Sequence, residues 1–412
     1  MTWRVPRDLA LAKSRLWGGS ASRGQAAEPP TVRVTASAMT RGREEERLEV
    51  GSPTIGYPMQ HITPKLRRIK MKRVFRWNGW SVGLLMLGII GTEATPGYGA
   101  RRTPVEQLQQ TQACRRCDLQ ELDLSGAQLQ GVDLRGANLN QTNLEGANLE
   151  GANLEGAILT QTNLQQANLS QAIVVEGQLG QAELQGANLT QANFNFARLG
   201  RANLEGAQLQ GAQFLSARLN RVNLAGANLA GADFRSASLD GADLQQVRWS
   251  QTNFEGASLR EATLRGSSGF GVNLNRANLI NADLTDVMLP EGRLTGAVAV
   301  AAIFADADLS GAALNLGDFQ GADLTGANLQ GAVLSEILLM GAVLRGTNLT
   351  YSYMFGANLT GAQLQGTRFY GCDLRGVLFR GADLTEADLT DAIIEGADFT
   401  DAVLTGATIP QV

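Results

Sequence analysis

Residues 146–155 read GANLEGANLE, two copies of a five-residue unit whose only large apolar residue is leucine. We call this leucine position the centre of a unit. Centres recur every five residues from Leu119 to Ile409 without insertion or deletion, and 52 of the 59 centres are Leu or Phe. The residue two places before the centre is Ala in 39 of the 59 units. The other centres are Val174, Trp249, Gly269, Ala299, Met354, Ile394 and Ile409.

A period of five fits neither an α-helix, which repeats every 3.6 residues, nor a strand, which repeats every two. The Ala and the Leu of one unit alternate as inward neighbours, and the Gly two places after the Leu supplies a turn backbone. One such unit cannot bury a core, but stacked turns can. The repeat therefore predicts an elongated solenoid.

The phenylalanines predict the size of one turn of this solenoid. The four phenylalanines of the first set below are each 20 residues apart, as are the last two of the second set, whose first member is in the same 20-residue phase. This places four units in each coil; three or five units would scatter these rings over different faces. With about 4.8 Å between coils, some 14 coils make a rod roughly 70 Å long. The expected core columns are Phe194, Phe214, Phe234 and Phe254, and, in a second column, Phe319, Phe379 and Phe399.

The triplets Ala147-Asn148-Leu149 and Ala382-Asp383-Leu384 resemble the pentapeptide-repeat family, and the resemblance covers residues 117–409. It implies an all-β fold, a right-handed quadrilateral β-helix, in agreement with the phenylalanine spacing. Members of that family include DNA mimics that protect topoisomerases, but most have no assigned biochemical activity.

The first hundred residues differ in character from the rest. They hold 16 Lys or Arg against 7 Asp or Glu, whereas the remainder holds 19 basic and 32 acidic residues. Residues 1–70 show no periodicity and are rich in Arg, Ser, Pro and Gly. Two interpretations stay open: a disordered segment, or a segment outside the translated product, which would then start at Met71.

Residues 71–100 have the order of a secretory signal peptide. Lys72, Arg73 and Arg76 precede an apolar run at 80–90, and small and turn-forming residues follow, with cleavage after Ala94 or Ala100. A short buried or interfacial segment is the alternative. The run is shorter than the roughly 20 residues that span a bilayer. We therefore expect an exported protein, in the periplasm or a thylakoid-lumen-like compartment, whose mature form has no transmembrane span.

Each end of the solenoid must be covered, because an open end exposes unpaired backbone groups. The sequence predicts a different cover at each end. In the segment 101–116, the sequence TPVE at 103–106 is typical of a capping box with Pro at the first helical position, and predicts a capping helix over roughly 104–112. The tail 410–412 contains no such helix. Either Pro410 blunts this edge or two rods meet end to end; the resemblance favours a homodimer through the C-terminal end.

Cys114 and Cys117 lie where the expected cap meets the repeats. A metal site needs about four ligands, and Cys372, about 13 coils away, is too far to join them. In an exported protein the pair is a disulfide that fastens the cap. A pair of inert thiols is the alternative.

Catalytic chemistry is not expected. No lysine follows Lys72 and the only histidine is His61, so the usual general bases are missing from the repeats. The carboxylates occupy outward positions of a convex rod without a cleft, and the glycines are repeat corners. We predict no catalytic residue, no cofactor, no metal site and no enzymatic activity.

Two surface features remain. Arg198 and Arg218 are one coil apart, as are Arg201 and Arg221, so the four should form a small basic square. The alternative is a set of solvated side chains that nearby acids neutralise.

The second feature is aromatic. The residues Tyr351, Tyr353, Phe355 and Tyr370 fall at outward positions on two adjoining faces, and Leu338, Met340 and Leu378 fall outward on a third. Such a cluster suggests a partner surface, and degeneration of the repeat without a function is the alternative.

The centre at Gly269 is empty, because glycine has no side chain. We expect a local bulge or bend there, with Phe270 folded inward, and a recognition loop is the second interpretation.

These observations favour an exported structural or protein-interaction rod whose protein partner is unidentified and which does not bind nucleic acid directly. A DNA mimic that binds a topoisomerase is the alternative. A mimic needs strong, continuous negative charge and a cytoplasmic location, whereas the net charge of −13 over residues 101–412 is mild and 19 arginines interrupt it.

Overall fold

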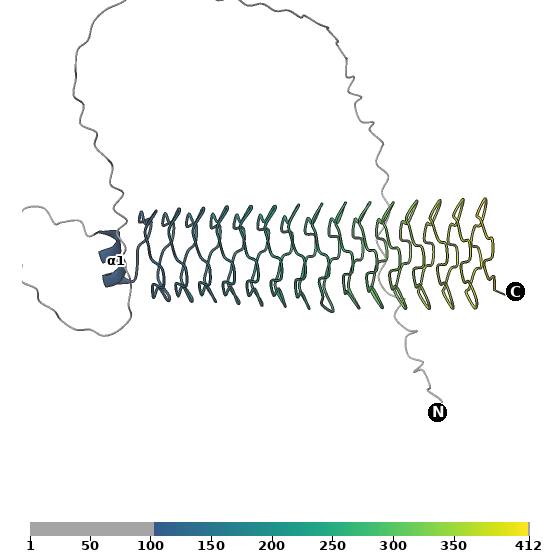
Figure 1. Cartoon of the computed structure of the whole chain (residues 1–412), viewed down its shortest axis with the longest axis horizontal. Helices are drawn as coiled ribbons and strands as arrows, with labels where there is room; N and C mark the ends of the chain where they lie inside the picture. Colours follow the sequence, from purple (N-terminus) through teal and green to yellow (C-terminus); the bar gives the residue numbers. More distant parts are fainter. Residues whose placement is uncertain (1–102, 411–412) are drawn as a thin grey trace, which may run out of the picture. The chain divides into compact units, whose positions relative to one another are not determined.

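The computed structural model describes residues 103–410, as one short helix followed by regular coils (Figure 1). The helix, α1, covers Pro104–Thr111. None of the described residues belongs to a helix long and apolar enough to cross a membrane. Four parts of the chain lie outside the described residues. They are the segments predicted over 1–70 and 71–100, the first two residues of the cap segment and the last two residues of the tail.

The coils are joined by parallel β-bridges between residues 20 apart. The first bridge pairs Ala113 with Asp133 and the last pairs Asp388 with Thr408. Each bridge is a single residue wide, and no longer strand forms between residues 103 and 410. Four units therefore complete one coil, so the predicted right-handed quadrilateral β-helix is confirmed.

The backbone of each unit bonds to the coil before it and the coil after it. The N–H of Leu149 donates to the carbonyl of Asn168 at 2.7 Å, and the N–H of Asn148 donates to Ala127 at 2.9 Å. The residue two places after the centre has a left-handed backbone, with φ of 62° at Gly151 and 56° at Gln141. Glycine is thus not required at the corners, although a non-glycine residue there costs roughly 1–2 kcal/mol.

The predicted phenylalanine columns are present in the core. Phe194, Phe214, Phe234 and Phe254 stack with ring centroids 4.7–5.1 Å apart. Phe379 and Phe399 stack at 4.9 Å, but Phe399 is only partly buried. Phe319 is in the same register and instead contacts Phe304 on the next face at 5.5 Å.

The expectation that Phe270 folds into the core at Gly269 is wrong, because Phe270 is 55 % exposed. Trp249, one coil earlier in the same column, fills the space instead. A Cβ at Gly269 would lie 2.6 Å from Trp249 Cδ1 and 2.5 Å from the backbone nitrogen of Ser250. The 20-residue register continues through this site, since Ser268 bridges both Arg248 and Met288.

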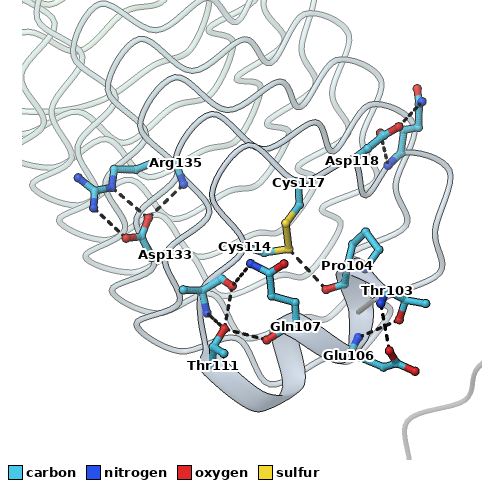
Figure 2. The surroundings of a disulfide bond; sticks show 12 residues. Thr103, Pro104, Glu106, Gln107, Thr111, Cys114, Cys117, Asp118, Asp133 and Arg135 are labelled. Carbon is cyan, nitrogen blue, oxygen red and sulfur yellow. Dashed lines mark hydrogen bonds and ion pairs between the residues drawn. A yellow bond between two sulfur atoms is a disulfide. The ribbon is translucent and has the colours of Figure 1, made fainter. Parts of the chain in front are cut away.

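The two ends of the solenoid differ as expected. At the N-terminal end, the hydroxyl of Thr103 accepts from the Glu106 N–H at 3.2 Å, while the Thr103 N–H donates to the Glu106 carboxylate at 3.0 Å. This capping box starts α1, which covers the first coil (Figures 1 and 2). In the last coil, the N–H groups of Ile394, Phe399 and Leu404 have no acceptor among the described residues.

Candidate interaction surfaces

The repeats contain no group of three or more His, Cys, Asp or Glu arranged to hold a metal ion, as far as the described residues go. Polar residues that do enter the core are used by the backbone. The buried hydroxyl of Thr252, for example, donates to the carbonyl of Leu229 at 2.8 Å. What the rod offers to other molecules is therefore its outer surface.

A disulfide joins Cys114 and Cys117 beneath α1 (Figure 2). Cys114 is fully buried five residues before the first centre, Leu119, and its sulfur lies 3.4 Å from the carbonyl oxygen of Pro104 in the helix. The bond therefore fixes the start of the first coil against the cap. Cys372 is a separate, buried thiol within 2.8 Å of the Leu349 carbonyl, and burial raises its pKa.

Ion pairs surround the cap on the outer surface. The Asp133 carboxylate pairs with Arg135 at 2.8 Å (Figure 2). It also pairs with Arg115, from the preceding coil, at 2.6 Å. The hydrogen bond from Arg135, with the second from Arg115, holds the pKa of the Asp133 carboxyl well below its usual range. Because both arginine side chains remain substantially exposed, the pairs contribute little to stability individually.

The aromatic residues predicted as outward are in fact on the surface and close together. Tyr351, Tyr353 and Phe355 are 54 %, 57 % and 52 % exposed. Tyr370 is half-buried, and its ring meets that of Tyr351 edge-on with centroids 5.5 Å apart. A hydrogen bond to the Asp391 carboxylate, with a further contribution from Tyr351, raises the pKa of Tyr370 to about 12. We call these four residues the aromatic surface.

Two residues that the sequence reading missed extend the aromatic surface. Val333, which is exposed, pairs directly with Tyr353 in a β-bridge. Leu316, also exposed, lies on the same corner as Phe355, two coils earlier. Val333 replaces the polar residue that usually stands just before a centre, and Leu316 replaces the glycine or polar residue that usually stands two places after one. The same repeat pattern could therefore have found them.

The apolar residues of the third face are less continuous. Leu338 is exposed, Leu378 is half-buried, and both pair with Asn358, which separates them. Met340 is half-buried at the far corner of that face. The structure thus brings the four aromatic residues together but leaves these three apart.

The four arginines predicted as a basic square are all exposed on two successive coils. Arg198 and Arg218 are bridge partners, and Arg201 and Arg221 occupy the adjoining corner one coil apart. None of the four has a carboxylate oxygen within 4.0 Å among the described residues, although seven other ion pairs form there. The interpretation that nearby acids neutralise them is therefore not supported by direct pairing.

A family model described as pentapeptide repeats matches segments between residues 114 and 406. Among solved structures, the chain is similar to HetL from Nostoc sp. PCC 7120, a pentapeptide repeat protein involved in regulating heterocyst differentiation. That match has 26 % identity, covers 72 % of this chain and 90 % of HetL, and has a TM-score of 0.21.

Two other solved structures are similar over shorter stretches. A pentapeptide repeat protein from the Arabidopsis thaliana thylakoid lumen is 32 % identical over 23 % of this chain and 63 % of its own, with a TM-score of 0.18. Rfr23 from Cyanothece 51142 is 26 % identical over 37 % of this chain and 97 % of its own, with a TM-score of 0.16. A comparison with curated protein sequences returned no match.

Proposed function

The chain belongs to the pentapeptide-repeat family, and on that premise we propose that it is a non-catalytic rod whose outer faces bind other proteins. The observation that carries the proposal is the aromatic surface. Three side chains that are more than half exposed stand on neighbouring units of a rod whose interior is already filled. Exposed aromatic clusters of this kind are enriched where proteins meet.

Proximity labelling with the full-length protein tests this function. The double variant Tyr353→Ser/Phe355→Ser should lose the labelled partner, because it removes two of the three rings of the aromatic surface that are more than half exposed. The matched control is Phe196→Ser/Phe270→Ser, which removes two rings of equal exposure from other parts of the rod. Loss of labelling in both variants, or in neither, contradicts the proposal.

We propose in addition that the protein is exported. The support is the signal-like order of residues 71–100 together with the disulfide at the cap, since disulfides persist in oxidising compartments. Fractionation of cells that express the full chain, followed by N-terminal sequencing of the mature protein, tests this. An uncleaved cytoplasmic protein that inhibits a topoisomerase would instead favour the DNA-mimic alternative.

End-to-end pairing of two copies is a further part of the proposal. The last coil presents partly exposed Phe399, exposed Ile409 and N–H groups that have no acceptor within residues 103–410. Asp391, Glu395 and Asp401 are exposed at three corners of the same coil, so two copies would repel each other at low salt. Sedimentation should show more dimer at 0.5 M than at 0.05 M NaCl (about a threefold difference in Debye length).

The variant Ile409→Asp should remain monomeric, whereas Leu316→Asp, which alters an equally exposed leucine away from the end, should still dimerise. A wild-type protein that is monomeric at both salt concentrations contradicts the pairing.

A further inference from the structure

One corner of the rod is hollowed over four successive coils, with a cavity volume of about 510 Å³ that is open to solvent. Its lining includes three arginines, Arg201, Arg221 and Arg260, and two acids, Asp240 and Glu261. Asn220 and small glycine residues form the rest of it. We call this feature the arginine hollow; Arg198 and Arg218 lie on the face next to it.

The arginines of the hollow form no ion pair within residues 103–410. None of the three guanidinium groups is within 4.0 Å of a carboxylate oxygen in the described part of the chain. Asp240 is already engaged, since its carboxylate accepts from the hydroxyl of Ser258 and from the N–H of Arg260. The hollow therefore contains cations whose hydrogen-bond donors are free for a ligand.

The absence of pairing follows from the sequence of these two coils. An arginine two places after a centre can reach a carboxylate just after the centre of the preceding coil, as Arg276 does with Glu255 at 4.0 Å. At the corresponding positions, 21 residues before Arg201 and Arg221, the chain carries Gly180 and Gly200. The only acid between residues 184 and 232 is Glu205. A concentration of positive charge thus interrupts a rod that is otherwise acidic.

We propose that the arginine hollow, with Arg198 and Arg218 beside it, binds an acidic segment of a partner polypeptide. Guanidinium groups bind carboxylates through two parallel hydrogen bonds, which gives such a contact its geometric specificity. The proposal rests on the protein-binding function proposed above and specifies the chemistry of one partner.

The dimensions of the hollow agree with a short peptide. Four coils at about 4.8 Å place its ends roughly 14 Å apart, which an extended segment of four to five residues spans at about 3.3 Å per residue. Alternate side chains of such a segment point the same way. Two or three carboxylates can therefore face the arginines at once, and several contacts are needed because a single exposed ion pair contributes little.

A nucleic acid fits this surface less well. Residues 103–410 carry 17 arginines against 32 acids, so the field of the whole rod opposes a long polyanion. Sequence-independent binding of nucleic acids relies on many phosphate contacts, commonly 6–10, which exceeds the cations available at one corner.

Fluorescence anisotropy with the full-length protein tests the inference. The probe is a labelled seven-residue peptide in which glutamate alternates with threonine, at 50 mM salt. The double variant Arg201→Gln/Arg221→Gln should weaken binding at least tenfold. The matched control, Arg235→Gln/Arg375→Gln, removes the same charge from two arginines that are paired with aspartates, and should bind within twofold of the wild type.

Equal weakening in both double variants would overturn the proposal, because it would show attraction to net charge alone. So would an absence of binding at millimolar peptide, or stronger binding of a single-stranded oligothymidylate or of inorganic phosphate than of the peptide. The measurement does not involve Tyr353 or Phe355, so its failure is distinguishable from failure of the aromatic-surface proposal.

Discussion

Replacing Trp249 and Gly269 with leucine, singly and together, tests how neighbouring coils share the core. The two residues occupy the same column in successive coils, where the repeat normally stacks leucine on leucine. Trp249 fills the space that a side chain at Gly269 would take. At these two positions one large side chain therefore replaces the two leucine side chains that other coils stack.

Each single change should destabilise the rod. Trp249→Leu leaves a void beside Gly269, and truncation of a large buried side chain of this kind costs about 2 kcal/mol. It breaks no hydrogen bond, because the indole nitrogen has no partner among the described residues. Gly269→Leu forces atoms into contacts of 2.5–2.6 Å and should cost about 2 kcal/mol or more, in the range measured for overpacked cores.

The double variant removes the contact with the Trp249 side chain but keeps those with the backbone of Trp249 and Ser250, so it should lie about 2 kcal/mol below the wild type, a coupling of about 2 kcal/mol. Urea unfolding of the full chain, followed by far-ultraviolet circular dichroism, measures the free energies. The control pairs Trp249→Leu with Ala299→Leu, another overpacked centre about 12 Å away, where the effects should add. If the Trp249 and Gly269 effects also add, the stacking argument is refuted.

Three further predictions concern single features. The variant Cys114→Ser/Cys117→Ser should lose about 2 kcal/mol of stabilisation, estimated from closure of a short loop; hydrogen exchange should quicken over residues 104–117 and stay unchanged in the middle coils. Asp391→Asn should lower the pKa of Tyr370 from about 12 towards 10, because it removes the carboxylate that disfavours the phenolate. An ultraviolet titration at 295 nm would measure this, and an unchanged titration curve would contradict it. Since the folded pKa of Tyr370 lies above its ordinary value, its contribution to stability is complete below pH 10 and is lost as the pH rises through about 12. Thr252→Ala should change the unfolding free energy by less than about 1 kcal/mol, because the Leu229 carbonyl keeps its bond from Ala232; a loss above 3 kcal/mol would contradict this.

The sequence by itself determined the fold, the number of units per coil and the phenylalanine columns. The physical reason is the unbroken register: when each coil has 20 residues, a side chain's neighbour above and below follows from its number alone. The capping box at Thr103 was equally predictable, because its hydrogen bonds join residues three apart in the chain. The outward position of the aromatic residues followed from the same register.

Only the tertiary structure decided which side chain fills each space in the core and which charged side chains form ion pairs. The register identified Gly269 as an empty centre, but the size and rotamer of Trp249 in the neighbouring coil determined what filled it. It left open whether acids of neighbouring coils such as Asp240 and Glu261 pair with the arginines of the hollow, because this depends on the direction in which each long side chain leaves its corner. Such directions arise from packing between coils, and a repeat pattern, which records position along the chain, does not contain them.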